Sequence, residues 1–152
     1  MTDRAARGAT TRGATIMQGG RAKAYRPLPA AERQAALSAA LEAYDRTDFF
    51  LAHELLEPAW MGADDMAERE LYQGLIKLAA AFVHGVRGNP LGIAKNLAGA
   101  RDRLTAARAA GAHQAGIDLD ELLADIDQRL GLLAGDASPD AIEPPILRRT
   151  AQ

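Results

Sequence analysis

The sequence predicts an all-α fold, an antiparallel bundle of about five helices in a single domain, on the basis of three observations. Hydrophobic residues make up 48% of the chain but aromatic residues only 5%, and alanine and leucine, both strong helix formers, supply much of the difference. Apolar residues recur at the three- and four-residue spacing of amphipathic helices. The length of 152 residues suits one domain that buries a core without disulfides or a structural metal.

Five segments carry the helical pattern. In chain order the predicted helices cover residues 29–46, 48–61, 65–87, 90–110 and 119–134. Thr47 or Asp48, Asn89 and Asp118 are expected to cap the helices that follow them, because their side chains can accept backbone N–H bonds. Pro58 should kink the second helix or end it early, since proline lacks an N–H. The fourth helix is rich in alanine and can serve either as a homo-oligomer seam or as a close-packed neighbour.

The charge is unevenly distributed along the chain. Residues 1–26 hold six basic residues and one acid, a net charge of +5, which leaves −7 for the remainder of a chain whose total is −2. This composition predicts a disordered, solvated tail over 1–26 in preference to an arm that contacts nucleic acid. Residues 27–135 are expected to form the bundle. An extended C-terminal tail is predicted over 136–152, with Ile142 and Ile146 tucked against the bundle.

Two features that the sequence lacks bear on where in the cell the protein is expected. The chain has no cysteine, which excludes disulfides and thiolate metal sites. No apolar run approaches the roughly 18 residues that span a bilayer, so no contact with a membrane is expected. The cytoplasm is the predicted location. Met17 is a second candidate start, which would leave residues 1–16 outside the native chain.

The stretch "FFLAHELLEPAW", residues 49–60, holds the first candidate functional residues. On a helix of this segment, His53 and Glu57 lie about 40° apart and Trp60 lies within about 60° of His53. The polar pair therefore shares the apolar face with the tryptophan, whereas Glu54 is more exposed. The next helix carries a complementary polar stripe on an otherwise apolar surface, made of Arg69, Gln73, Lys77 and His84.

These two polar features are expected to face each other, because buried polar groups need partners. A short connection makes the two helices antiparallel neighbours, which predicts an ion pair between Glu57 and Arg69 and a contact between His53 and Gln73. Three interpretations are open: a structural core network, a cleft that binds a small molecule, a metal or a partner without turnover, and a catalytic site. The candidate residues are His53, Glu54, Glu57, Trp60, Arg69, Gln73 and His84.

The binding cleft is the leading functional hypothesis, and a metal-dependent hydrolase is its alternative. That enzyme would bind zinc or iron through His53, Glu57 and His84, with Glu54 as general base. His84 lies about 16 Å further along its helix than Gln73, which makes a compact three-residue metal site difficult to form. No particular cofactor or reaction is indicated.

Longer motifs carry a family resemblance. The stretches "DFFLAHELLEPAW", "ERELYQGLIKLAAAFVHGVRGNPLGIAKNLAGARDRL" and "GIDLDELL" resemble the bacterial and archaeal family catalogued as domain of unknown function 309, over about residues 30–130. The resemblance implies a small all-helical bundle, and the family name implies no established activity. The chain departs from the family pattern at Pro58 and at Lys77, where glutamine is common. Lys77 adds a charge to the polar stripe.

Overall fold

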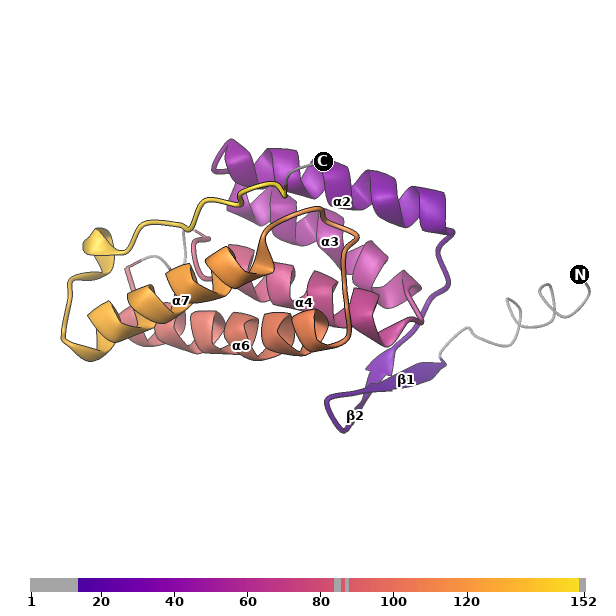
Figure 1. Ribbon diagram of the computed structural model, residues 1–152, viewed down its shortest axis with the longest axis horizontal. Coiled ribbons are helices and arrows are strands. Elements are labelled where there is room, and N and C mark those ends of the chain that lie inside the picture. Colours follow the sequence, from indigo (N-terminus) through magenta and orange to yellow (C-terminus); the bar gives the residue numbers. More distant parts are fainter. Residues whose placement is uncertain (1–13, 84–85, 87, 151–152) are drawn as a thin grey trace, which may run out of the picture.

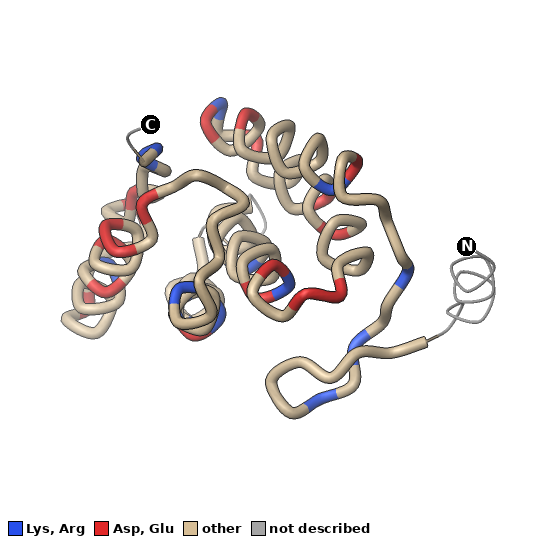
Figure 2. Tube along the Cα trace, turned by 45° about the vertical axis from the view of Figure 1, so that its right-hand side comes forward, with Lys and Arg blue, Asp and Glu red and all other residues tan. Residues whose placement is uncertain are grey.

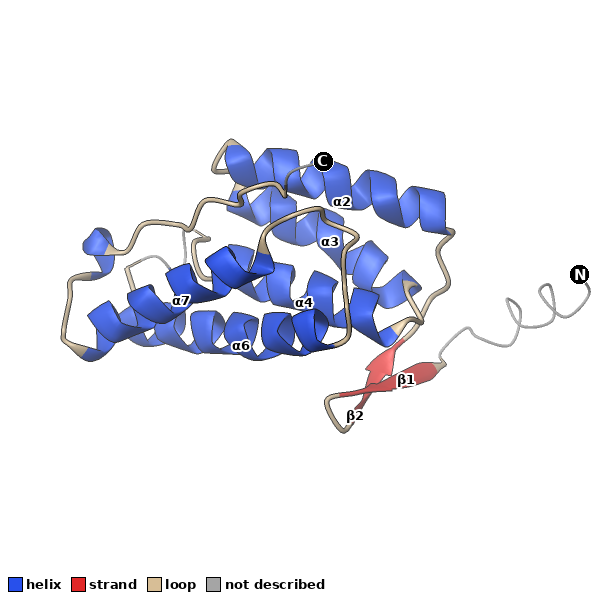
Figure 3. Ribbon diagram, viewed as in Figure 1, coloured by secondary structure: helices blue, strands red, loops and turns tan. Residues whose placement is uncertain are grey.

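A computed structural model describes residues 14–83, 86 and 88–150 of the chain and confirms the all-α fold class (Figures 1 and 3). Within these residues the α-helices are α2 (Ala30–Asp45), α3 (Phe49–Gly62), α4 (Met66–Ala80), α6 (Pro90–Ala109) and α7 (Leu119–Ala134). The remaining elements are β1 (Thr15–Gln18), β2 (Arg21–Ala24) and the 3-10 helix η1 (Pro139–Ala141). No described helix combines the length and the apolar character needed to cross a membrane.

Each helix packs on the next helix along the chain. α2 contacts α3, α3 contacts α4, α4 contacts α6, and α6 contacts α7 (Figure 1). Large apolar side chains from all five helices meet in one core, where they are almost completely buried: Leu37, Leu56, Leu71, Leu78, Ile93, Leu97, Leu104, Leu122 and Ile126. This burial is the main source of stability for such a bundle.

The predicted caps at the starts of the helices are present. Asp48 accepts a hydrogen bond from the backbone N–H of Leu51 at 3.2 Å. Asn89 accepts from Leu91 and Gly92, and Asp118 accepts from Glu121 at 3.0 Å. A cap that the sequence analysis did not assign is Asp65, which accepts from Glu68 N at 2.9 Å and begins α4. The side chains therefore determine where these helices begin.

Pro58 does not end α3, which continues to Gly62. The segment that leads into α2 crosses the end of α3 and supplies donors to its last carbonyls: Arg26 N donates to Met61 O at 2.7 Å and Leu28 N donates to Gly62 O at 3.2 Å. A Cβ at Gly62 would lie only 2.3 Å from Leu28 Cβ. The glycine is therefore needed to let the two segments cross.

The prediction of one helix over 65–87 is wrong in its end point. α4 ends at Ala80, and the chain turns through residues 81–83 with bonds to carbonyls three residues back, such as Phe82 N to Ala79 O. This tighter turn leaves Phe82 2% exposed, with its ring 5.8 Å from that of Phe49 on α3. Core packing of the phenylalanine thus accompanies the change in backbone path.

The prediction of disorder over 1–26 is wrong for residues 15–24, which form an antiparallel hairpin. Gly19 and Gly20 both have positive φ, +59° and +78°, as a two-residue hairpin turn of mirror-image type requires. The pair of glycines between two short segments was the missed signal. Residues 1–13, which carry three of the arginines, lie outside the described residues.

The C-terminal segment is extended after η1 and packs along the bundle (Figure 1). Ile142 is buried as expected, but Ile146 is 64% exposed, so that part of the prediction is wrong. Tyr44 on α2 donates its hydroxyl to Pro145 O at 2.7 Å. Thr150 N donates to Gly116 O at 2.8 Å. The segment is therefore bonded both to α2 and to the loop before α7.

Candidate functional site

The predicted cluster does not form one cleft. His53 lies near the two glutamates of its own helix, with Nδ1 3.5 Å from Glu54 Oε1 and Nε2 3.6 Å from Glu57 Oε1. Both glutamate side chains are about half exposed, at 55% and 46%. The His53 Nδ1 atom is buried and has no hydrogen-bond partner among the described residues. These three residues form a partly solvated group on α3, and Gln73 lies elsewhere, in the pocket described below.

The predicted ion pair between Glu57 and Arg69 is also wrong. Arg69 is completely buried, and its guanidinium donates to Gln18 Oε1 at 3.3 Å, and to the carbonyls of Trp60, Ala63 and Ala24 at 2.9, 2.9 and 3.3 Å. Carbonyls at the end of α3 and at the end of β2 take the place of a carboxylate, because buried carbonyls at the ends of helices and strands need donors.

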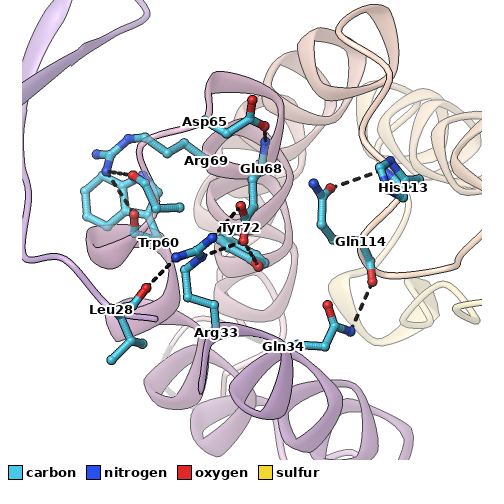
Figure 4. A network of polar contacts seen from close by, with 11 residues as sticks. Leu28, Arg33, Gln34, Trp60, Asp65, Glu68, Arg69, Tyr72, His113 and Gln114 are labelled. Carbon is cyan, nitrogen blue, oxygen red and sulfur yellow. Dashed lines mark hydrogen bonds and ion pairs between the residues drawn. The ribbon is translucent and has the colours of Figure 1, made fainter. Parts of the chain in front are cut away.

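Trp60 lies beside Arg69 (Figure 4), with the guanidinium carbon 5.0 Å from the centre of the indole ring. The indole N–H donates to Gln18 Oε1 at 2.8 Å. Gln18 in turn donates to Glu70 Oε1 at 2.8 Å and is only 2% exposed. Through its bonds to Trp60 and Glu70, the side chain of Gln18 therefore attaches the end of β1 to both α3 and α4.

The sequence analysis missed a second buried network, which joins α2 to α4 (Figure 4). Arg33 donates to both oxygens of Glu68, at 2.8 and 3.2 Å. Tyr72 donates its hydroxyl to Glu68, and Arg33 also donates to the carbonyl of Leu28. Burial and the bond to Glu68 raise the pKa of Tyr72. Every oxygen of the buried carboxylate is thus hydrogen-bonded.

The metal site suggested for His53, Glu57 and His84 cannot be assembled from the described residues, because His84 lies outside them. Within the described part of the chain, no three His, Asp or Glu side chains are grouped so that they could hold a metal ion.

A hollow between the hairpin, α4 and α6 is the strongest candidate site. Its volume is about 190 Å³. It is lined by polar and basic residues from three separate parts of the chain: Gln18, Gly19, Arg21, Lys23, Gln73, Lys77 and Arg103. We call it the cationic pocket. Two members of the predicted polar stripe, Gln73 and Lys77, lie one turn apart on α4 and face this pocket together with the hairpin.

The cationic pocket carries an excess of positive charge. Four of its lining residues are basic and none is acidic; the carboxylate nearest to them among the ion pairs of the described residues is that of Glu70, whose oxygens lie 2.9 and 3.1 Å from Arg103 Nη1. Four cations against one carboxylate leave a net charge of +3. Burial lowers the pKa of Lys77, and the neighbouring charges of Lys23, Arg103 and Lys95 lower it further. An anion in the pocket would offset the repulsion between these charges and favour the charged form of Lys77.

Two glycines make room for the basic side chains. A Cβ at Gly99 on α6 would lie 2.8 Å from Lys77 Cδ, so the stem of Lys77 lies directly across the glycine. A Cβ at Gly19 would lie 2.8 Å from Arg103 Nη1, so the hairpin turn rests against that guanidinium. The ammonium and the guanidinium are therefore held in place by close packing and not only by charge.

A larger hollow of about 260 Å³ lies between α2, the start of α3 and the C-terminal segment. Several of its polar groups already have partners, because Tyr44 donates to Pro145 O and Asp45 accepts from Arg149 at 3.1 Å. It offers fewer open charges to a ligand than the cationic pocket does.

The fold and the site thus define a small helical bundle with a basic pocket under an N-terminal hairpin. A family model described as "Domain of unknown function (DUF309)" matches residues 37–96, which confirms the resemblance predicted from the motifs. The match includes all of α3 and α4, with Gln73 and Lys77, and excludes the hairpin and Arg103. Comparison with curated proteins and with solved structures found no match.

Proposed function

We propose that this chain is a binding module that holds a small anionic group, phosphate in particular, in the cationic pocket. The observation that carries the proposal is the convergence of four basic side chains from β2, α4 and α6 on one hollow, where Arg103 alone of the four is paired with a carboxylate among the described residues, that of Glu70. This keeps the binding class predicted from sequence but moves the site from the α3–α4 face to the hairpin side of α4. A cytoplasmic location is part of the same proposal.

The chemistry of the lining residues supports phosphate as the ligand. Arg21 and Lys23 are not ion-paired to any carboxylate among the described residues, so their charges remain available. Arginine and lysine side chains bind phosphate oxygens through charge-assisted hydrogen bonds. The amide of Gln73 adds a neutral donor, whereas the amide of Gln18 already donates to Glu70 and accepts from Trp60 and Arg69.

The test is to titrate inorganic phosphate into the wild-type protein and into Lys77→Gln by isothermal titration calorimetry. A hydrogen bond to a charged group contributes about 1.5–3 kcal/mol. Loss of the Lys77 ammonium should therefore weaken phosphate binding by about tenfold to a hundredfold. Arg46→Gln is the matched control, because it removes one charge at the far end of α2 and should leave the affinity unchanged. Equal affinities for wild type and Lys77→Gln would contradict the proposal.

A second variant moves the lysine without removing a charge. Gly99→Ala places a methyl group 2.8 Å from Lys77 Cδ, so the flexible stem must shift away from its present position. Phosphate binding should fall severalfold. The free energy of unfolding, measured by urea denaturation, should stay the same or rise by up to about 1 kcal/mol, because alanine favours the interior of α6 over glycine. Unchanged binding would show that the position of Lys77 does not matter for the ligand.

A further inference from the structure

The cationic pocket is too small to enclose a whole drug-sized molecule. Pockets that surround drug-sized molecules occupy about 300–1,000 Å³, whereas this one has about 190 Å³. A single charged group fits such a volume, and the rest of the ligand would lie outside on the surface around it. The surface next to the pocket therefore indicates what kind of molecule carries that group.

That surface is basic on the hairpin side. Residues 14–29 include Arg21, Lys23 and Arg26 and contain no Asp or Glu. Figure 2 shows this as blue without red along the hairpin and the segment that leads into α2, while red residues lie along α7 and near the ends of α3 and α4. Arg21 and Arg26 are exposed. On the other side of Lys77, the charge of Lys95 on α6 is close enough to lower the lysine's pKa.

The hairpin also has a suitable shape. Its two strands pair with each other over four residue pairs, from Thr15 with Ala24 to Gln18 with Arg21, and it projects beyond the ends of the helices (Figure 1). The buried amide of Gln18 anchors one end of it to Trp60 and Glu70. A two-stranded ribbon held in this way presents a row of side chains to a partner along its length.

We infer that the partner is a nucleic acid, with one backbone phosphate inside the cationic pocket at Lys77 and the adjacent phosphates at its hairpin side, on Arg21 and Lys23. This inference rests on the proposed function and specifies its ligand. Regularly spaced phosphates match a basic pocket that continues into a basic ribbon, and a nucleic acid strand can contact this face while the acidic helices stay away from it. No base-reading group is required, so binding should be independent of sequence.

The experiment measures binding of a single-stranded oligonucleotide of about 16 nucleotides, and of its duplex, by fluorescence anisotropy over a series of salt concentrations. Three phosphate contacts, made by Lys77, Lys23 and Arg21, predict a slope of log K against log salt of about −2 for the single strand and about −2.7 for the duplex. Each of Lys77→Gln, Lys23→Gln and Arg21→Gln should make the slope shallower by about 0.7–0.9. Inorganic phosphate should compete.

Further variants distinguish binding by the cations of the hairpin from binding by the arginines that precede it. A triple variant that changes Arg4, Arg7 and Arg12 to glutamine leaves the hairpin cations in place and should still bind with a slope that depends on Lys77. Arg46→Gln should bind like the wild type. If the triple variant abolished binding while Lys77→Gln, Lys23→Gln and Arg21→Gln had no effect, the inference would be wrong.

The two proposals fail in different ways. Phosphate binding that depends on Lys77, together with no oligonucleotide binding at low salt, would overturn the nucleic-acid inference and leave the proposed function intact. Absence of phosphate binding would overturn both. Vesicles that contain anionic lipid serve as the remaining probe, because binding to them in place of the oligonucleotide, with the same dependence on Lys77, Lys23 and Arg21, would also overturn the inference.

Discussion

Replacing Arg69 with alanine is expected to lower the free energy of unfolding by about 3–5 kcal/mol. The guanidinium is completely buried and donates to Gln18 and to three backbone carbonyls, so its removal deprives all four acceptors of one hydrogen bond in the interior, although Gln18 Oε1 keeps its bond from Trp60. Burial lowers the pKa of Arg69, which reflects the cost of placing the charge there. The variant therefore loses several bonds at once and should also release the hairpin from α4.

Urea denaturation followed by circular dichroism measures this loss. Arg69→Lys should recover little of it, because a single ammonium cannot reach the same widely spaced acceptors as a planar fork of donors. Arg101→Ala is the control: its side chain is 43% exposed and its nearest carboxylate oxygens are 3.7 and 3.8 Å away, so a change below about 1 kcal/mol is expected. A loss of that small size for Arg69→Ala would contradict the network described here.

Replacing Glu68 with alanine should be about equally damaging, with a loss of about 3–5 kcal/mol. The carboxylate is 8% exposed and accepts two bonds from Arg33 and one from Tyr72. Without it, the Arg33 charge, whose side chain is only 17% exposed, loses its counter-ion, and the fully buried Tyr72 hydroxyl loses its acceptor. The damage comes from the groups left behind more than from the bonds removed.

A double-mutant cycle with Arg33→Met isolates this effect. Because methionine removes the stranded charge, Glu68→Ala should cost less in the Arg33→Met background than in the wild type, by at least about 1 kcal/mol. Asp127→Ala serves as the surface control, since its side chain is 61% exposed and lies 3.7 Å from Arg101. Additive costs for the two substitutions would show that Arg33 and Glu68 do not stabilise each other.

The helices could be predicted because their signals are local. Apolar periodicity located each helix, and Asp48, Asn89 and Asp118 marked the starts of α3, α6 and α7. The hairpin was missed because two strands of four residues that themselves contain Thr15, Arg21 and Lys23 resemble a solvated tail in composition. The Gly19–Gly20 turn was the signal that could have revealed it.

The partners of the polar side chains could not be predicted in the same way. With α3 and α4 alone, a carboxylate such as Glu57 is the obvious partner for a buried arginine such as Arg69. The structure adds a third element, the hairpin, and with it backbone carbonyls and the Gln18 amide as competing acceptors. Gln73 and Lys77 were identified as one polar stripe, but the residues facing them, Arg21 and Arg103, come from distant parts of the chain.

The C-terminal segment affects the order in which the chain can fold. Helices that pack on their chain neighbours meet after closing only short loops, which favours rapid folding. The bond from Tyr44 to Pro145 spans 101 residues, and the ion pair between Asp45 and Arg149 spans 104. Such contacts require the largest loop closures, which cost little only once the helices between them have assembled. During synthesis we therefore expect α2 to lack these two contacts until residues 145–149 have emerged.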